Sequence, residues 1–503
     1  MKLIFLCILL EIYSKEVSYN IDNQITASAT KRKMYKPDWK DLDTRPLPQW
    51  YDSAKIGIFL HWGVYSVPCF KSEWFWKNWK DGDIPVLEFM KKSEYHINMT
   101  YEEFAPMFKA EKFVPEQWAD LFVASGAKYV VITAKHHDGY TLFPSGRPNW
   151  NAIDVGPKKD ILRVLSKAIR NRNMKFGVYY SLLEWYNELY LRDKKAHFKT
   201  TLYPDNIVWP DVEFLIENYK PSVLWFDGES EANTSYWKTR ELLAWLYNES
   251  PVKDEIVVND RLGDGTLCRH GDIFNCDDKY NPRTLMHHKW ENAFPLDRKS
   301  WGYRREMQLN DVCNFDELIE TIVSTVSCGG NALINVGPTK EGTIVPVFQE
   351  RLLQLGQWLD INGEAIYNTS PWFHQRDSLN PDVWYTCVKK VYNQLEPIAL
   401  PYVTDTIKAV YAIFLKWPSD GILKMKDAEF TFKRKKNKIK LLNSEGYALV
   451  NAQIVNDVVE VNLTKIFRSS APVEYFSENN LHAWVLKISP TVTGLKTVYT
   501  FST

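Results

Sequence analysis

Short apolar runs alternate with amphipathic segments from about Lys55 to Pro338, and this alternation constrains the fold more than any other feature of the sequence. Continuous apolar strands of about four to eight residues are typical of parallel sheets that are covered on both faces. The segments between the runs have helical periodicity, as in the apolar stripe between Ile161 and Ile169. Such strand–helix repeats predict an α/β fold with a (β/α)₈-like barrel. The predicted strands are residues 56–61, 129–135, 176–180, 222–226, 255–259, 273–276, 300–303 and 331–336.

The sequence changes character after Ile366. Segments such as residues 409–415 and 483–488 are short and alternating or β-branched, and turn signals such as Pro418 to Gly421 lie between them. This texture predicts an antiparallel β-sandwich. The predicted domains are residues 30–370 for the barrel and residues 371–503 for the β-sandwich.

The N-terminus has the pattern of an export signal. Lys2 precedes an apolar stretch, Leu3 to Leu10, that is too short to span a bilayer. We predict a signal peptide over about residues 1–14, no membrane insertion, and a destination in the secretory pathway, either lysosomal or extracellular. Asn-x-Ser/Thr sequons fit this route, and Asn248 is the least expected to carry a glycan because Ser250 and Pro251 follow it. The sequons are at Asn98, Asn233, Asn248, Asn368 and Asn462.

The charges of the chain are balanced, with 62 Lys and Arg against 62 Asp and Glu. Such a chain attracts neither phosphate backbones nor anionic lipids over a distance, so we expect no nucleic-acid partner. The 20 Trp and 27 Tyr residues favour a carbohydrate ligand only weakly, because aromatic rings stack on sugars but also fill cores.

The cysteines do not predict a disulfide-rich scaffold. The chain has seven, and Cys7 lies in the predicted signal peptide. Cys268 and Cys276 are close enough in sequence to form a bridge, and buried free thiols are an equal alternative. No Cys-x-x-Cys or His-x-x-x-His spacing indicates a structural zinc.

Polar and aromatic side chains follow six successive predicted strands. A barrel presents its reactive groups where strands end and loops begin, so these side chains are expected at one rim. Each alone has a structural alternative, since an Asp at a strand end often caps the next helix. Their convergence favours a site. The strand ends are His61-Trp62-Gly63, Lys135 to Gly139, Tyr179-Tyr180 with Glu184-Trp185 beyond, Trp225 to Glu229, Asn259-Asp260-Arg261, and Asp277-Asp278.

Carboxylates among aromatic and histidine side chains are what glycoside cleavage requires. Asp227 is the best candidate nucleophile, because it ends a buried apolar strand and Gly228 allows a tight turn there. A metal hydrolase is the alternative, but the adjacent His136 and His137 point to opposite sides of an extended chain and cannot easily share an ion. We expect no metal, and no nucleotide cofactor either, because no Gly-rich phosphate loop follows the first strand.

Several ordered motifs resemble glycoside hydrolase family 29, the α-L-fucosidases, and are similar to the animal tissue (lysosomal) branch of that family. The resemblance covers most of the chain from about Arg45 onward. Its motifs are Arg45-Pro46-Leu47-Pro48-x-Trp50, Gly57 to Gly63, Ser72 to Trp76, Lys135-His136-His137, Asp260-Arg261, Lys289-Trp290-Glu291 and Asn335 to Pro338.

The resemblance implies a (β/α)₈-like domain, a C-terminal β-sandwich, and hydrolysis with retention of anomeric configuration. It places the nucleophile at Asp227. For the acid/base it leaves Asp278 as the first choice, Glu291 as the rival and Asp277 as the third candidate. Only one of Tyr179 and Tyr180 is able to face the sugar. The sugar-contacting positions that it implies are His61, Glu73, Trp74, His136, His137, Tyr179, Trp225 and Arg261.

The predicted function is removal of terminal α-L-fucose from glycoproteins, glycolipids or oligosaccharides, through a covalent glycosyl-enzyme. Fucosylated glycans are the expected partners. The sequence leaves open a homo-oligomer and transfer of fucose to an acceptor other than water. A secreted, lectin-like fucose-binding protein with weak catalysis is the alternative from another functional class.

Overall fold

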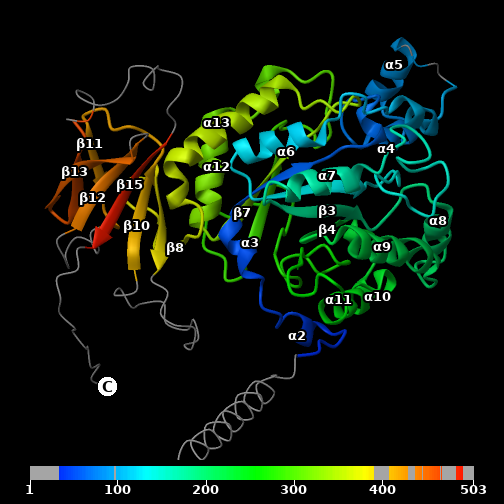
Figure 1. Ribbon diagram of the computed structural model, residues 1–503, viewed down its shortest axis with the longest axis horizontal. Helices are drawn as coiled ribbons and strands as arrows, with labels where there is room; N and C mark the ends of the chain where they lie inside the picture. The colour runs from blue at the N-terminus through cyan, green and yellow to red at the C-terminus, as the bar shows by residue number, and fades with distance from the viewer. Residues whose placement is uncertain are drawn as a thin grey trace, which may run out of the picture.

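The structure is a computed structural model that describes residues 33–93, 95, 98–389, 407–428, 437–443, 446–464, 466 and 483–490. The predicted signal peptide lies outside the described residues. Figure 1 shows a parallel sheet surrounded by helices and, beside it, an antiparallel sheet formed by the C-terminal part of the chain. The predicted fold class, an α/β barrel followed by an antiparallel β domain, is confirmed.

Seven parallel strands form the barrel wall, in the order β5-β4-β3-β2-β1-β7-β6. Isolated bridges pair Asn259 with Ile273 and Phe274 with Trp290, and so connect the two edge strands β5 and β6. Ile273 and Phe274, which lie between β5 and β6, complete the ring of strands at the place where the sixth strand was predicted. The strands are β1 (Ile56–Leu60), β2 (Tyr129–Lys135), β3 (Lys175–Ser181), β4 (Val223–Asp227), β5 (Val257–Val258), β6 (Trp290–Pro295) and β7 (Gly330–Val336).

Residues 300–303 form a loop, so the prediction of a strand there is wrong. The seventh position in the barrel belongs instead to β6, which lies earlier in the chain. The backbone amides of Trp301 and Gly302 join no strand ladder because both donate to the carboxylate of Glu73, at 3.0 Å each. The fifth and sixth predicted strands are also shorter than expected. The fifth is the two-residue strand β5, and the sixth consists only of the bridged residues Ile273 and Phe274.

Helices cover the outside of the barrel wall (Figure 1). They begin where the sequence provides caps: Asp160 accepts from the amide of Arg163 at the start of α7, and Asn314 and Glu317 form a capping box on α12. The helices are α2 (Trp39–Leu42), α3 (Gln49–Ala54), α4 (Phe75–Lys80), α5 (Ile84–Lys92), α6 (Pro115–Ala124), α7 (Ile161–Arg170), α8 (Glu188–Lys195), α9 (Trp209–Tyr219), α10 (Thr234–Trp237), α11 (Thr239–Asn248), α12 (Phe315–Ser327) and α13 (Pro346–Asn362).

Side chains on the barrel strands alternate between the inside of the barrel and the layer under the helices. On β3, Tyr179 belongs to the inner cluster, whereas Tyr180 lies in the outer layer and donates to Asp211. On β6, the same alternation places Ala293 and Glu291 inside. The two layers therefore decide which strand residues are able to reach a site within the barrel.

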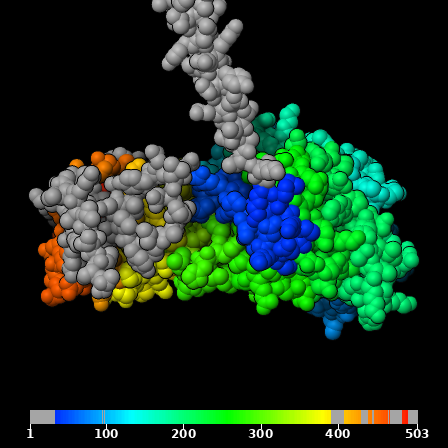
Figure 2. Space-filling model, turned by 90° about the horizontal axis from the view of Figure 1, so that it is seen from below, coloured from blue at the N-terminus to red at the C-terminus, as the bar shows by residue number. Residues whose placement is uncertain are grey.

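The C-terminal sheet is antiparallel, in the order β11-β14-β13-β12-β15-β10-β9-β8. One face encloses its own core, which includes Tyr385, Phe414 and Val461. The other face packs on α12 and α13, where Trp358 Nε1 donates to the carbonyl of Ala483 at 3.0 Å. Figure 2 shows the two parts side by side along the long axis of the molecule. The strands are β8 (Ser370–Arg376), β9 (Val383–Lys389), β10 (Ile407–Phe414), β11 (Ile422–Met425), β12 (Asn437–Asn443), β13 (Gly446–Val455), β14 (Val458–Asn462) and β15 (Trp484–Pro490).

Two further findings concern the cysteines and the helices of the described residues. Cys268 and Cys276 form a disulfide, which settles the alternative that the sequence left open. None of the helices in the described ranges has both the length and the hydrophobicity needed to cross a membrane. The described cysteines outside the disulfide are free and buried, at positions 69, 313, 328 and 387.

The sequon at Asn248 is expected to carry no glycan. Its Nδ2, the atom that a glycan would occupy, donates to the carbonyl of Tyr35 at 2.8 Å, and its Oδ1 accepts from the amide of the same residue. Glycopeptide mass spectrometry of the secreted protein should find Asn248 unmodified, and an occupied Asn248 would contradict this account. The exposed sequons, at Asn98, Asn233, Asn368 and Asn462, are available for modification.

Candidate active site

A cavity of about 260 Å³ opens where β1 to β4 end. The cavity lining contains every residue that the family resemblance implied as a sugar contact. It also contains Asp227 and Asp278. Asp277 and Glu291 do not belong to the lining. The lining residues are Phe59, His61, Glu73, Trp74, Lys77, His136, His137, Tyr179, Leu183, Trp185, Trp225, Asp227, Gly228, Glu229, Ser230, Glu231, Arg261, Asp278 and Trp301.

Asp227 ends β4 and has hydrogen-bond donors on both carboxylate oxygens. Tyr179 Oη donates to Oδ2 at 2.6 Å, and Arg261 Nη1 donates to Oδ1 at 3.1 Å. His137 Nε2 lies 3.5 Å from Oδ2. Burial by itself would raise the pKa of Asp227, but Arg261, then His137 and the Tyr179 hydrogen bond, outweigh it and hold the pKa below its ordinary value. The carboxylate is therefore ionised and oriented, as a nucleophile must be.

The turn after Asp227 depends on glycine. Gly228 has φ of 74°, in the left-handed region that side chains rarely adopt. A Cβ atom there would lie 2.9 Å from Leu183, which leaves no room for a larger residue. The turn ends β4 at the rim and leaves the Asp227 carboxylate facing the cavity.

Arg261 connects the two cavity carboxylates. Its Nη2 donates to Oδ1 of Asp278 at 2.6 Å, while its Nη1 holds Asp227. The guanidinium carbon lies 5.0 Å from the ring centre of Trp225, whose aromatic face attracts the cation. The carboxylates of Asp227 and Asp278, together with Glu229 and Asp260, raise the pKa of Arg261 further above its ordinary value against the effect of burial. One permanently charged group thus spans a pair of carboxylates across the cavity.

Burial favours the neutral form of three histidines in the lining. Burial lowers the pKa of His61 and of His136, and it lowers that of His137 to about 4. Asn335 donates to a carbonyl through its Nδ2, so its Oδ1 accepts from His61 Nδ1 at 2.7 Å and leaves His61 Nε2 as an acceptor. His136 Nδ1 is buried without a hydrogen-bond partner in the structure. Neutral imidazoles with free donor or acceptor atoms suit the hydroxyl groups of an uncharged sugar.

Glu73 is fixed by the loop that the sequence suggested as a strand. Its Oε2 accepts from Ser300 Oγ and from two backbone amides of that loop, at 3.0 Å each. The other carboxylate oxygen, Oε1, makes none of these three bonds. Trp301, on the same loop, packs at 5.2 Å against the ring of His61. The loop therefore orients the carboxylate of Glu73 and contributes the ring of Trp301 to the wall of the cavity.

Aromatic rings line the cavity from its floor to its mouth. Tyr179 stacks on Trp225 with ring centres 5.6 Å apart. At the mouth, Trp74 is 42% exposed and lies 5.1 Å from Trp185. An exposed indole face beside a polar cavity, such as that of Trp74, is typical of sites that bind sugar rings.

Glu291 lies inside the barrel, below the cavity. It is fully buried, and its carboxylate accepts hydrogen bonds from Tyr51, Tyr129, Trp225 and Asn275. Burial raises the pKa of Glu291 even though these hydrogen bonds lower it. Trp225, which is part of the cavity lining, connects Glu291 to the site, because its Nε1 donates to Glu291 Oε1. This geometry favours Asp278 over Glu291 as the group that reaches a leaving oxygen.

Replacing Glu291 by glutamine should therefore affect substrates with good and poor leaving groups equally. We expect kcat/KM to fall by no more than about tenfold, with a loss of about 1–3 kcal/mol in the free energy of unfolding, because buried hydrogen bonds are weakened. Kinetics on two substrates that differ in their leaving group, together with a thermal melt, would measure both. A much larger loss on the poor leaving group would instead identify Glu291 as the acid.

Glu229 is the most notable residue that the sequence interpretation did not assign. It follows Gly228 directly, is 5% exposed and lines the cavity. Burial raises the pKa of Glu229 to about 7; Arg261 opposes this shift and Asp227 adds to it. Its place two residues after a candidate nucleophile was a usable signal. Three aromatic residues of the lining were also not assigned from the sequence: Phe59, Trp185 and Trp301. Their sequence positions gave little indication of a role, because aromatic residues are common throughout the chain.

Glu229 should make the stability of the protein depend on pH. Between its ordinary pKa of 4.5 and about 7, the folded chain keeps a proton that the unfolded chain has released. This contribution is fully present below pH 4.5 and is lost as the pH rises through 7. The thermal midpoint of Glu229→Gln, which stays neutral, should therefore rise relative to wild type over that range. The exposed Glu350→Gln is the control, and parallel curves for wild type and Glu229→Gln would contradict the prediction.

Within the residues that the structure describes, no group of three or more His, Cys, Asp and Glu side chains is arranged to share a metal ion.

Comparison with protein families gives two matches. Residues 23–364 match the model of the alpha-L-fucosidase family, and residues 375–489 match that of the alpha-L-fucosidase C-terminal domain. Together they span both parts of the described fold.

Individual relatives agree with these matches. The chain is 47% identical to tissue alpha-L-fucosidase of Rattus norvegicus, over 90% of this chain and 92% of that protein. It is 51% identical to plasma alpha-L-fucosidase of Homo sapiens, over 79% of this chain and 81% of that protein. Among solved structures it is similar to the Thermotoga maritima alpha-fucosidase in complex with fucose, with a TM-score of 0.72, 32% identity, and coverage of 90% of this chain and 100% of that chain.

Proposed function

The chain belongs to the α-L-fucosidase family, and on this premise we propose that it removes terminal α-L-fucose from glycans with retention of configuration. The observation that carries the proposal is the pair of carboxylates, Asp227 and Asp278, held on two nitrogens of Arg261 at one cavity. Retaining glycosidases use such a pair, about 5–5.5 Å apart, as nucleophile and acid/base.

In the first step Asp227 attacks carbon 1 of the bound fucose. A bond forms between the carboxylate oxygen and carbon 1, the bond from carbon 1 to the glycosidic oxygen breaks, and Asp278 gives its proton to the departing oxygen. Tyr179 and Arg261, which hydrogen-bond Asp227, keep its carboxylate oriented during the attack. The result is a covalent glycosyl-enzyme.

In the second step Asp278, now ionised, takes a proton from water as that water attacks carbon 1. The bond from carbon 1 to Asp227 breaks, fucose leaves with its original configuration, and Asp278 is again protonated. The half-exposed side chain of Asp278 is accessible to water, as this exchange requires; its exposed fraction is 51%.

The dimensions of the cavity support action at chain ends. A cavity of about 260 Å³ has the size of one sugar ring rather than of a glycan chain. The histidines and Glu73 are placed to bind its hydroxyl groups, and the exposed Trp74 lies at the mouth, where the rest of the glycan would emerge. Fucosylated glycoproteins, glycolipids or oligosaccharides are the proposed substrates.

A lysosomal or extracellular location is part of the same proposal. The predicted signal peptide, the exposed sequons and the Cys268–Cys276 disulfide all support it. The relatives include both tissue and plasma fucosidases. Assembly into a homo-oligomer stays a prediction from the sequence, and a size measurement in solution is its test.

An assay with an aryl α-L-fucoside at acidic pH tests the proposed activity. Release of the phenol is expected, and proton NMR of the first-formed sugar should show α-fucose before it equilibrates. Binding of fucose without release of phenol would favour a lectin-like protein, and first-formed β-fucose would contradict the retaining mechanism.

A further inference from the structure

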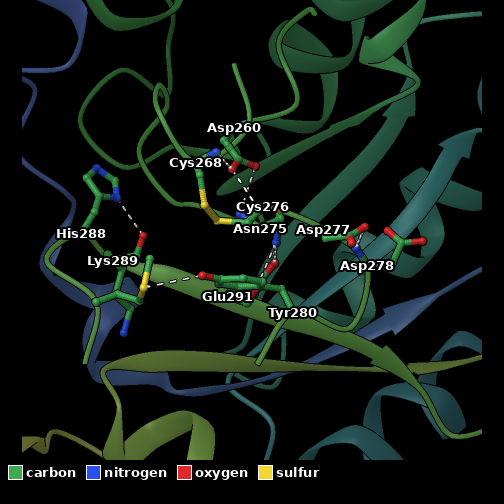
Figure 3. The surroundings of a disulfide bond; sticks show 11 residues. Asp260, Cys268, Asn275, Cys276, Asp277, Asp278, Tyr280, His288, Lys289 and Glu291 are labelled. Atoms are coloured by element: carbon green, nitrogen blue, oxygen red, sulfur yellow. Dashed lines mark hydrogen bonds between the residues drawn. A yellow bond between two sulfur atoms is a disulfide. The ribbon is translucent and has the colours of Figure 1, made fainter. Parts of the chain in front are cut away.

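The loop that carries Asp278 begins at the disulfide. Figure 3 shows Cys276 bonded to Cys268, with Asp277 and Asp278 following Cys276 in the chain, and Asp278 lines the cavity. Arg261 holds the Asp278 carboxylate from one side, but that side chain is 51% exposed. A carboxylate so exposed is not fixed by its own contacts alone, so its direction depends on the backbone that carries it.

Asp260 binds both ends of the disulfide-closed segment. It is fully buried, and its Oδ2 accepts from the backbone amides of Cys268 at 2.8 Å and Cys276 at 3.0 Å. Its Oδ1 accepts from the amide of Asn275 at 3.0 Å. Hydrogen bonds from amides to a carboxylate are stronger than those to neutral acceptors. Arg261 follows Asp260 in the chain, so one turn both holds the loop and presents the guanidinium that contacts Asp278.

Both cysteines have a backbone conformation that needs support. Their φ angles are 57° for Cys268 and 60° for Cys276, in the left-handed region that is costly for residues other than glycine. Such conformations persist only where the surroundings hold them. The disulfide and the Asp260 carboxylate are what hold them here. Without these restraints, we expect Cys276 to return to negative φ and the residues after it to turn in another direction.

The other side of Asp278 is attached to the barrel. The amide of Lys279 donates to the carbonyl of Ala293 on β6 at 3.1 Å, and Lys279 Nζ donates to the carbonyl of Arg298 at 2.9 Å. Asp278 therefore lies between Lys279, which these hydrogen bonds hold to the barrel, and the disulfide-closed segment that ends at Cys276.

We propose that Asp260, Cys268 and Cys276 form a positioning clamp that aims Asp278 at the glycosidic oxygen. The proposal rests on the proposed function, because it takes Asp278 as the acid/base. Opening the clamp should weaken proton transfer selectively. Asp227 keeps its place on β4 and its bond from Tyr179, so attack on carbon 1 is affected less.

The double variant Cys268→Ser/Cys276→Ser tests the clamp on two fucosides, one with a nitrophenol and one with an unactivated alcohol as the leaving group. A good leaving group departs without a proton, whereas a poor one needs the acid. We expect kcat/KM on the unactivated substrate to fall at least about tenfold more than on the nitrophenyl substrate. Equal losses on both substrates would overturn the proposal.

Two further measurements apply if the double variant fails to fold. Cys268 is exposed, so a phosphine reductant is able to open the disulfide in the folded wild-type enzyme. Asp260→Asn keeps the disulfide but turns an amide group toward the three backbone donors. Reduction of the disulfide and the Asp260→Asn change should each lower kcat/KM selectively on the unactivated substrate. If each lowers kcat/KM equally on the two substrates, the proposal is overturned.

The control is Cys313→Ser, which removes a buried free thiol outside the clamp and should leave the ratio between the two substrates unchanged. Asp278→Gly separates this inference from the proposed function. If Asp278→Gly itself shows no dependence on the leaving group, the role of Asp278 is wrong. If Asp278→Gly shows that dependence and the clamp variants do not, only the clamp is wrong.

Discussion

Replacing Asp227 by glycine should lower kcat on any α-L-fucoside by about four orders of magnitude or more, the scale of loss on removing a nucleophile. The change removes the atom that attacks carbon 1, and the donors that oriented it, Tyr179 Oη and Arg261 Nη1, then face an empty space. Initial rates of phenol release measure the loss. Near-normal activity in a folded variant would overturn the assignment.

The product formed by the Asp227→Gly variant provides a second test. An anion such as azide fits the space left by the carboxylate and attacks carbon 1 from the same face. With an activated substrate, we expect azide to restore turnover and to give β-fucosyl azide, because a single displacement inverts the configuration. Asp382→Asn, a surface change in the C-terminal domain, is the control and should have wild-type kinetics. An α-configured azide would contradict the role of Asp227.

Replacing Asp278 by asparagine should have the next largest effect, and that effect should depend on the leaving group. On a poor leaving group we expect a loss of about 10²–10⁴-fold in kcat/KM, the usual contribution of a positioned general acid. On an activated leaving group the first step needs no proton, so kcat/KM should change little while hydrolysis of the glycosyl-enzyme becomes slow. Steady-state kinetics on the two substrates measure this difference.

Azide distinguishes the two carboxylates. In Asp278→Asn the covalent intermediate still forms on Asp227, and azide attacks it without needing a base, so the product should be α-fucosyl azide. Asp277→Asn is the matched neighbour: its carboxylate accepts from the amide of Asp278 but does not line the cavity, so only a small loss is expected. If Asp277 rather than Asp278 shows these effects, the two assignments must be exchanged.

The site was predictable from the sequence to the extent that it lies at strand ends. His61, His136, Tyr179 and Trp225 follow or end apolar runs, and a parallel barrel brings the ends of its strands to one rim. Alternation requires one of Tyr179 and Tyr180 to face inward but does not say which one; the family resemblance implied Tyr179, and the structure has Tyr179 in the cavity lining.

The errors came from interactions between distant parts of the chain. Residues 300–303 resemble a strand, but two of their amides bond to Glu73, and no local pattern shows such a partner. Because the seventh strand was predicted at residues 300–303, the strand β6 and the position of Glu291 on it were missed. Once β6 is known to start at Trp290, alternation places Glu291 inside the barrel rather than at the rim. The raised pKa of Glu229 also depends on burial, which the sequence does not report.

Trapping of the covalent intermediate tests the central claim most directly. A 2-deoxy-2-fluoro-fucosyl fluoride has a good leaving group, and its fluorine at carbon 2 slows both steps, so the glycosyl-enzyme should accumulate. Peptide mass spectrometry after brief incubation should find one fluorofucosyl group, attached to Asp227. An adduct on Asp278 or Glu229, or steady release of fluoride without any adduct, would contradict the account.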